Sequence, residues 1–192
     1  MGKVIERTLV SLDGIIGDPH VWALPYFDKA AQDDALAELM ASEAMLMGRR
    51  TYAIFAKLWP SRTGAYFDQI NAMKKYVFSS DLRNADWRNT SIIRGDVVDE
   101  VAKLKRESAK DLVIYGHTSI AQVLLAHGLL DEIQLAVHPV LVGAGKLLFR
   151  EGERAALDLM EVKPRPNGVV ALRYRPATKA IKDAERLTMI SA

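Results

Sequence analysis

The sequence predicts an α/β domain with a mostly parallel central sheet, helices on both of its faces and an antiparallel hairpin at the C-terminal edge. Strand-like apolar runs alternate with segments of helical periodicity along most of the chain. The last two strand-like runs flank Pro166-Asn167-Gly168, which is a strong hairpin signal. A chain of 192 residues with 49% hydrophobic content suits one domain with a sizeable core. We assign residues 1–176 to this domain, and we expect the weakly patterned residues 177–192 to form a mobile tail.

In the first half of the chain we expect strands at residues 3–11, 44–47, 75–78 and 90–93. We expect helices at residues 28–42, 49–57 and 65–74. Leu36, Leu39 and Met40 fall on one face of the first helix, as a helix packed on a sheet requires. The second helix ends before Pro60, which cannot continue it.

In the second half, residues 97–107 form a clear amphipathic pattern, and Asp96 is a suitable N-cap for that helix. Residues 111–115 are a buried strand that Gly116 interrupts, and the next helix runs from Thr118 or Ser119 to residue 126. Further strands are expected at residues 132–137, 157–163 and 169–175, the last two forming the hairpin.

Composition excludes several classes of site and partner. The 26 basic and 24 acidic residues nearly balance, so nucleic acid is not expected as a partner. No apolar run reaches membrane-spanning length and the N-terminus lacks a signal-peptide core, so we expect a cytoplasmic protein without membrane contact. The absence of cysteine removes disulfides, cysteine nucleophiles and thiolate metal sites, and no metal is expected.

Three expected strand ends carry glycine or small polar residues: Gly48-Arg49-Arg50-Thr51, Ser79-Ser80 and Gly116-His117-Thr118-Ser119. In open α/β sheets, ligands bind where the carboxyl ends of strands meet. The first and third segments also begin helices, whose free N–H groups attract phosphate. Together with the arginines they predict a pyrophosphate site, with a ribose or ribose phosphate near the serines.

Each of these segments also has a purely structural interpretation. The arginines can serve solubility, Ser79-Ser80-Asp81 can be a strand-ending turn, and Gly116-His117-Thr118 can cap a helix. The joint occurrence of the three segments favours the anion site.

The chain resembles proteins of the dihydrofolate-reductase-like fold, and within them the reductase domain of riboflavin biosynthesis and its stand-alone relatives. The resemblance covers residues 3–175 and implies a three-layer fold. Its motifs here are Ser11-Leu12-Asp13-Gly14-Ile15-Ile16-Gly17, Trp22-Ala23-Leu24-Pro25, Met47-Gly48-Arg49-Arg50-Thr51-Tyr52, Val77-Phe78-Ser79-Ser80, Val113-Ile114-Tyr115-Gly116, Leu129-Leu130-Asp131-Glu132 and His138-Pro139-Val140-Leu141-Val142-Gly143-Ala144-Gly145-Lys146-Leu147-Leu148-Phe149. Their order and spacing carry the resemblance.

The resemblance implies NADPH binding and hydride transfer to a pterin-like or pyrimidine-like ring. On the adenosine side it assigns the phosphate to Arg49 and the ribose to Ser79 and Ser80. It assigns the pyrophosphate to Arg50 and Thr51. The segment Gly116, His117, Thr118 and Ser119 would approach the pyrophosphate and the nicotinamide side, and Ile16 and Gly17 would border the nicotinamide. Arginine favours NADPH over NADH because it can bind a 2′-phosphate in bidentate fashion. His117 stands where relatives often have a second glycine, so we expect its side chain either to crowd the pyrophosphate or to donate a hydrogen bond to it.

On the substrate side, hydride transfer to a C=N bond requires a proton source. By resemblance the candidate carboxylates are Asp28 and Asp13. Asp28 can instead be a helix N-cap, and Asp13 can instead be an Asp-Gly turn residue. Trp22 is either an anchor for its loop or part of the substrate wall.

The leading hypothesis is therefore an NADPH-dependent reductase of a nitrogen heterocycle, with folate itself disfavoured. The alternatives are a non-catalytic nucleotide-binding or structural protein that retains the fold, and a reductase of an unrelated carbonyl or imine. Residues 132–137 and the glycine loop at 143–145 could support a homodimer, as relatives suggest.

Overall fold

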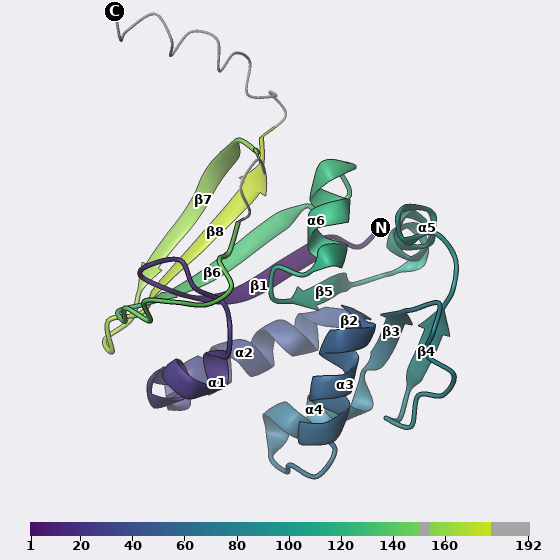
Figure 1. The fold of residues 1–192 in the computed structure, drawn as a ribbon, viewed down its shortest axis with the longest axis horizontal. Coiled ribbons are helices and arrows are strands. Elements are labelled where there is room, and N and C mark those ends of the chain that lie inside the picture. The colour runs from purple at the N-terminus through teal and green to yellow at the C-terminus, as the bar shows by residue number, and fades with distance from the viewer. Residues whose placement is uncertain (150–153, 178–192) are drawn as a thin grey trace, which may run out of the picture.

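A computed structural model describes residues 1–149 and 154–177 (Figure 1). Within these residues an eight-stranded sheet has the order β4-β3-β2-β5-β1-β6-β8-β7. The strands are β1 Val4–Ser11, β2 Ser42–Gly48, β3 Lys74–Phe78, β4 Thr90–Ile93, β5 Asp111–Tyr115, β6 Glu132–His138, β7 Leu157–Pro164 and β8 Val170–Pro176. Strands β1 to β6 are parallel, whereas β8 is antiparallel to β6 and to β7. The predicted α/β fold with a mostly parallel sheet is confirmed.

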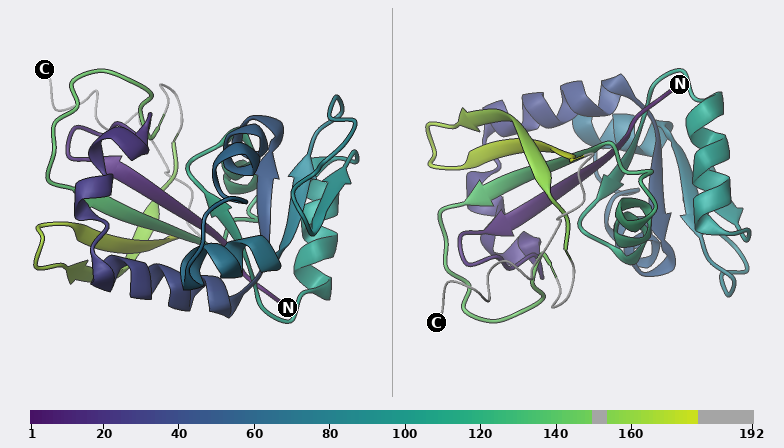
Figure 2. Two further views of the ribbon diagram at one scale, coloured as in Figure 1. Left: turned by 90° about the horizontal axis from the view of Figure 1, so that it is seen from below. Right: turned by 90° about the horizontal axis from the view of Figure 1, so that it is seen from above.

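Helices cover both faces of the sheet, as predicted (Figures 1 and 2). They are α1 Pro19–Trp22, the short 3₁₀ helix η1 Leu24–Tyr26, α2 Lys29–Ala41, α3 Arg49–Leu58, α4 Ala65–Ala72, α5 Val97–Glu107 and α6 Ser119–Ala126. Helices α5 and α6 lie on one face, and α2, α3 and α4 lie on the other. The sequence pattern did not predict α1 or η1, which are single turns in a loop. None of the helices in the described parts of the chain has the length and apolar character needed to cross a membrane.

Each face of the sheet has its own hydrophobic core, because the central parallel strands are buried on both sides. Leu46 and Ile114 face α5 and α6, whereas their neighbours Met45, Met47 and Val113 face α2, α3 and α4. These residues are all at most 1% exposed. Burying one such side chain contributes about 1.5–3 kcal/mol to the stability of the fold. The buried residues of β2 and β5 therefore hold these two strands at the centre of the sheet.

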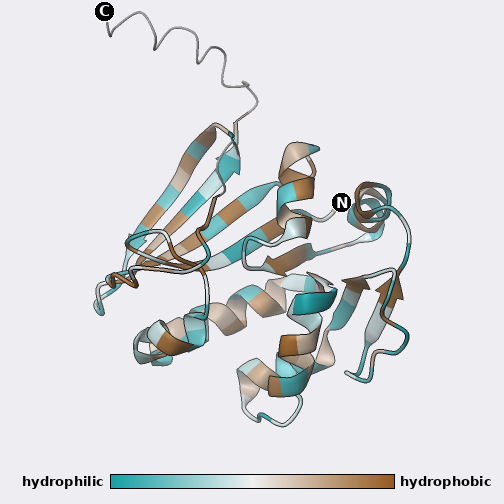
Figure 3. Cartoon of the chain, in the orientation of Figure 1, coloured by the Kyte–Doolittle hydropathy of each residue, from teal (hydrophilic) through white to brown (hydrophobic). Residues whose placement is uncertain are grey.

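The C-terminal hairpin also forms as predicted. Its turn is closed by a hydrogen bond of 3.0 Å from the Gly168 N–H to the Arg165 carbonyl, and Gly168 has a φ of +87°, which favours glycine. Strand β8 joins β6, so β7 becomes the sheet edge. Apolar and polar positions alternate along these strands (Figure 3). The predicted tail lies outside the described residues from residue 178 onward.

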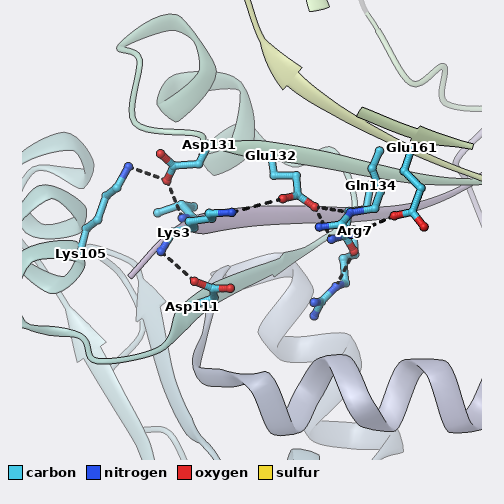
Figure 4. Close-up of polar contacts among 10 residues, drawn as sticks. Lys3, Arg7, Lys105, Asp111, Asp131, Glu132, Gln134 and Glu161 are labelled. Atoms are coloured by element: carbon cyan, nitrogen blue, oxygen red, sulfur yellow. Dashed lines mark hydrogen bonds and ion pairs between the residues drawn. The ribbon is translucent and has the colours of Figure 1, made fainter. Parts of the chain in front are cut away.

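A row of polar side chains crosses the sheet on the face that α2 covers. Strand register aligns Tyr115, Arg7, Gln134, Arg173 and Glu161 across β5, β1, β6, β8 and β7. Arg7 Nε donates to Gln134 Oε1 at 2.9 Å, and Arg173 Nη1 donates to Glu161 Oε2 at 2.9 Å. Figure 4 shows the part of this row from Arg7 to Glu161 together with Glu132. Glu132 accepts from Gln134 at 2.6 Å and from Arg173 at 2.8 Å. The row links the hairpin to the middle of the parallel sheet.

Candidate active site

The three predicted strand ends lie together at one edge of the sheet. Strands β3, β2 and β5 are parallel neighbours, with Gly48 opposite Phe78 and Leu46 opposite Ile114. The segments that follow them therefore emerge side by side. This is the arrangement in which open α/β sheets bind ligands.

Two helices start at this edge without a side-chain cap. Helix α3 begins directly after β2, and α6 begins shortly after β5, and neither has a side-chain hydrogen bond at its N-cap. By contrast, the starts of α2 and α5 are capped by the side chains of Asp28 and Asp96. A Cβ placed on Gly48 would lie 3.8 Å from Ile120 Cδ1, so the two uncapped starts adjoin. Their free N–H groups and positive dipole ends favour an anion here.

The segment between β5 and α6 has room for such an anion. Gly116 has a φ of +79°, and a Cβ added there would meet nothing closer than Thr118 Cγ2 at 4.0 Å. Within the described residues, Thr118 Oγ1 is buried and has no hydrogen-bond partner. Because a buried hydroxyl without a partner is unfavourable, it is suited to donate to a bound phosphate oxygen.

Arg49 and Arg50 lie at the first turn of α3 and are exposed, and Thr51 is half-buried. Within the described parts of the chain, neither guanidinium forms a hydrogen bond or an ion pair with another side chain. Both therefore remain available to phosphate groups. Ser119, the first residue of α6, is also exposed.

Ser79 and Ser80 lie beside this edge, but their hydroxyls are used in a turn. Ser79 Oγ accepts from the Leu82 N–H at 3.0 Å and from the Asp81 N–H at 3.2 Å, and Ser80 Oγ donates to Asp81 Oδ1 at 2.9 Å. The strand-ending turn is therefore formed. A role in holding a ribose stays a prediction.

The expectation that the His117 side chain meets the pyrophosphate is wrong for this structure. The side chain is fully buried, and its Nδ1 lies 2.9 Å from Oε2 of the equally buried Glu6. Its ring also contacts Phe149 edge-on, with the centroids 5.2 Å apart. The carboxylate on β1 and the apolar ring hold the imidazole beneath the strand end.

Ile16 and Gly17 are tied to the same edge through Lys146. The Ile16 N–H donates to the Lys146 carbonyl at 2.8 Å, and Lys146 Nζ donates to the His117 carbonyl at 2.9 Å. Trp22 Nε1 donates to the Gly17 carbonyl at 2.8 Å, and its ring meets His138 edge-on. Trp22 therefore anchors its loop.

Both predicted carboxylates already accept hydrogen bonds within the fold, and a catalytic role for either stays a prediction. Asp13 accepts from Ser11 Oγ at 2.5 Å and from the Gly143 N–H at 2.7 Å. The Ser11 hydrogen bond and then the Gly143 hydrogen bond lower the pKa of Asp13 to about 2, so it is ionised at neutral pH. Asp28 is exposed; it caps α2 through the Ala31 N–H at 2.9 Å and accepts from Asn167 at 2.9 Å.

A polar cluster that the sequence analysis missed lies beneath the end of β5. Its members are Arg7, Glu38, Tyr66 and Tyr115, from β1, α2, α4 and β5. Arg7 Nε lies 3.0 Å from Glu38 Oε2. Burial raises the pKa of the Tyr115 hydroxyl, an effect that the positive charge of Arg7 and a hydrogen bond with Tyr66 oppose. The only sequence signal was the pair Glu6-Arg7 inside an otherwise apolar strand.

Comparisons with known proteins agree with this architecture. The RibD C-terminal domain family matches residues 2–171. The uncharacterized protein YyaP of Bacillus subtilis (strain 168) is 30% identical over 181 residues, which cover 90% of this chain and 94% of YyaP. A putative riboflavin biosynthesis protein from Shewanella sp. PV-4 has a TM-score of 0.72 at 21% identity, covering 91% of this chain and 99% of that chain.

Dihydrofolate reductase from Enterococcus faecalis, solved with NADP(H), has a TM-score of 0.62 at 14% identity. The match covers 91% of this chain and 96% of that chain. At these identities the two structures show a shared dihydrofolate-reductase-like fold.

Proposed function

The chain belongs to the RibD C-terminal domain family, and on that premise we propose that it is an NADPH-dependent reductase of a nitrogen heterocycle of the pyrimidine or pterin kind. The observation that carries the proposal is the pair of uncapped helix starts at the ends of β2 and β5, beside an unpartnered buried hydroxyl within the described residues. The NADP(H) bound to the Enterococcus faecalis reductase of the same fold supports it.

In this proposal the first turns of α3 and α6 hold the pyrophosphate, with Thr118 Oγ1 donating to one of its oxygens. Arg50 and Thr51 also hold the pyrophosphate. Arg49 binds the adenosine-side phosphate, where its bidentate geometry selects the 2′-phosphate of NADPH over the hydroxyl of NADH. Ile16 and Gly17 border the nicotinamide. Bound NADPH supplies a hydride, which together with one proton converts a C=N bond into CH–NH and leaves NADP⁺. The protein's contribution is to orient the two rings and to exclude water.

Thr118→Val tests the cofactor site. Because the valine removes an unpartnered buried hydroxyl, we expect unchanged or slightly higher stability. We expect NADPH affinity to fall by about 10-fold, the effect of losing one hydrogen bond to a charged group. Thr90→Val is the matched control, since Thr90 Oγ1 is likewise buried without a partner in the described residues but lies at the start of β4. Fluorescence titration measures the NADPH affinity of both variants, and urea unfolding measures their stability. A loss of NADPH affinity in Thr118→Val but not in Thr90→Val supports the cofactor site, and equal affinities contradict it.

Arg49→Met and Arg50→Met test the two arginine roles. We expect Arg49→Met to weaken NADPH binding by about 10-fold or more and to leave NADH binding nearly unchanged, because the lost contact is with the 2′-phosphate. We expect Arg50→Met to weaken both cofactors, because both carry the pyrophosphate. Equal losses for both cofactors with Arg49→Met would place Arg49 elsewhere. Absence of NADPH binding to the unmodified protein at millimolar concentration would end the proposal.

The proposal also includes a cytoplasmic homodimer, for which light scattering is the direct test. A non-catalytic nucleotide-binding protein is the alternative, and NADPH binding without oxidation across a panel of pterins and pyrimidines would favour it. A His117 side chain that crowded the pyrophosphate would favour that alternative, but the side chain is buried beneath the strand end.

A further inference from the structure

Arg7 is a charged side chain in an unusual place. It lies within β1, which is an interior strand of the sheet, and its side chain is only 11% exposed. Its Nε is shared between Gln134 Oε1 at 2.9 Å and Glu38 Oε2 at 3.0 Å. Its Nη1 is buried, yet has no hydrogen-bond partner in the described residues. A buried guanidinium nitrogen without a partner is costly, so a purely structural ion pair explains this arrangement poorly.

The position of Arg7 places the cluster beside the proposed cofactor site. Arg7 is the register partner of Tyr115, the last residue of β5, and the Gly116 N–H donates to the Arg7 carbonyl at 2.7 Å. Figure 4 shows the Arg7 side chain among the polar residues of the row. A group bound against Arg7 and Tyr115 is thus one residue away from the strand end where the nicotinamide side of the cofactor is expected.

Aromatic side chains surround this polar cluster. The ring centroids of Phe55 in α3 and of Trp59, the C-cap of that helix, lie 6.4 and 6.2 Å from that of Tyr115. Tyr66 meets Phe27 edge-on, with the ring centroids 5.8 Å apart. Both line a cavity of about 250 Å³ between α2 and the start of α4, which adjoins the polar cluster through Tyr66. Aromatic side chains beside charged groups suit a flat, polar heterocycle.

We propose that Arg7 and Glu38 bind the substrate ring and determine which heterocycle is accepted, in place of Asp13 and Asp28. This inference rests on the proposed function. Arg7 Nη1 donates to an acceptor on the ring, and the half-buried Glu38 carboxylate accepts from a neighbouring N–H. The pair therefore complements a ring edge in which an N–H donor adjoins a carbonyl or ring-nitrogen acceptor. It disfavours a ring whose nitrogens carry methyl groups in place of hydrogen, because Glu38 then loses its donor.

The electrostatics of Glu38 fit this role. Burial raises the pKa of the Glu38 carboxyl, and so does the nearby charge of Asp34, whereas Arg7 and, more weakly, Arg165 and Arg173 lower it. Because burial destabilises the ionised form of Glu38, a hydrogen bond from an N–H group of the ligand would stabilise that form. Ring binding should therefore weaken as the pH falls through the pKa of Glu38, because the protonated carboxyl is a poorer acceptor.

The test uses calorimetric titration of the full chain saturated with NADP⁺. The probes are 5,6-diaminouracil, which has the N–H and carbonyl edge, and its 1,3-dimethyl derivative, in which methyl groups replace both ring N–H hydrogens. We expect the unmethylated uracil to bind more tightly. We expect Arg7→Met and Glu38→Gln each to weaken its binding by about 10- to 100-fold, as for charge-assisted hydrogen bonds. Arg7→Lys should recover part of the affinity.

Asp34→Asn is the matched control. Asp34 lies one turn before Glu38 on α2 and pairs with Lys163 and Arg165 rather than with Arg7. We expect this variant to bind the uracil like the unmodified protein. Thermal unfolding reports whether Arg7→Met folds. If it does not fold, the uracil affinities of Glu38→Gln and Arg7→Lys test the inference instead.

The outcomes separate this inference from the proposed function. If NADP⁺ binds but neither probe does, or if the dimethyl derivative binds better, or if Glu38→Gln retains full affinity for 5,6-diaminouracil, the inference is wrong and the cofactor site stands. If NADP⁺ itself does not bind, the proposed function is wrong, and the inference that rests on it falls with it.

Discussion

Gly116 and Gly48 end neighbouring strands, yet only Gly116 needs to be glycine. Gly116 has a φ of +79°, whereas Gly48 has a φ of −84°, which any residue adopts. We expect Gly116→Ala to destabilise the fold by about 1–2 kcal/mol because of the left-handed backbone. The added methyl also enters the proposed pyrophosphate site, so NADPH affinity should fall as well.

Gly48→Ala is the control for this substitution. Its new Cβ meets Ile120 Cδ1 at an ordinary 3.8 Å, so the unfolding free energy should change by less than about 0.5 kcal/mol. Urea unfolding and NADPH titration of the two variants give both readouts. Equal destabilisation by the two alanines would contradict the backbone argument.

At the scale of the element, Asp28 is the start signal of α2. It accepts from the Ala31 N–H at 2.9 Å. We expect Asp28→Ala to lower the unfolding free energy by about 0.5–2 kcal/mol and Asp28→Ser to retain most of it, since serine also caps helices well.

The same two variants test the prediction that Asp28 is catalytic. If Asp28 only caps the helix, Asp28→Ser keeps the turnover of whichever heterocycle the unmodified protein reduces. Loss of turnover in a stably folded Asp28→Ser protein would restore Asp28 as the proton source. Steady-state kinetics alongside thermal unfolding distinguishes the two roles.

The helices and strands were predictable because their signals are local. Asp96 accepts hydrogen bonds from the Val98 and Asp99 N–H groups, as its position before an amphipathic run indicated. The Pro166-Asn167-Gly168 turn likewise encodes its hairpin within a few residues. The strand ends at Gly48 and Gly116 were recognisable for the same reason.

The missed part of the site depends on contacts distant in sequence. Arg7 and Glu38 are 31 positions apart, and Arg7 meets Tyr115 only through the register of β1 with β5. The direction of the His117 side chain depends on Glu6, 111 positions away. Such pairings follow from strand order, which local patterns do not encode.

At the scale of the whole molecule, the polar row connects the edge hairpin to the interior of the sheet. Glu132 is its central carboxylate, with a side chain only 2% exposed. Burial alone would raise the pKa of Glu132, but the hydrogen bonds from Arg173 and Gln134 outweigh burial and hold the pKa below its usual value of 4.5. The folded protein therefore binds this proton less readily than the unfolded chain does.

This difference predicts how stability depends on pH. The stabilisation from Glu132 is complete above about pH 4.5 and is lost as the pH falls through the lower folded-state pKa. Glu132→Gln should lower the unfolding free energy at pH 7 by about 1.5–3 kcal/mol, the contribution of hydrogen bonds to a charged group. It should also reduce the loss of stability on acidification.

Glu161→Gln is the matched control, because Glu161 also pairs with Arg173 but is 48% exposed. An exposed pair contributes about 0–1 kcal/mol, so this variant should follow the unmodified protein across the acid range. Urea unfolding at several pH values between 3 and 7 measures all three proteins. If the Glu132→Gln curve ran parallel to that of the unmodified protein, the carboxylate would not be ionised preferentially in the fold, and the row would owe its stability to neutral hydrogen bonds alone.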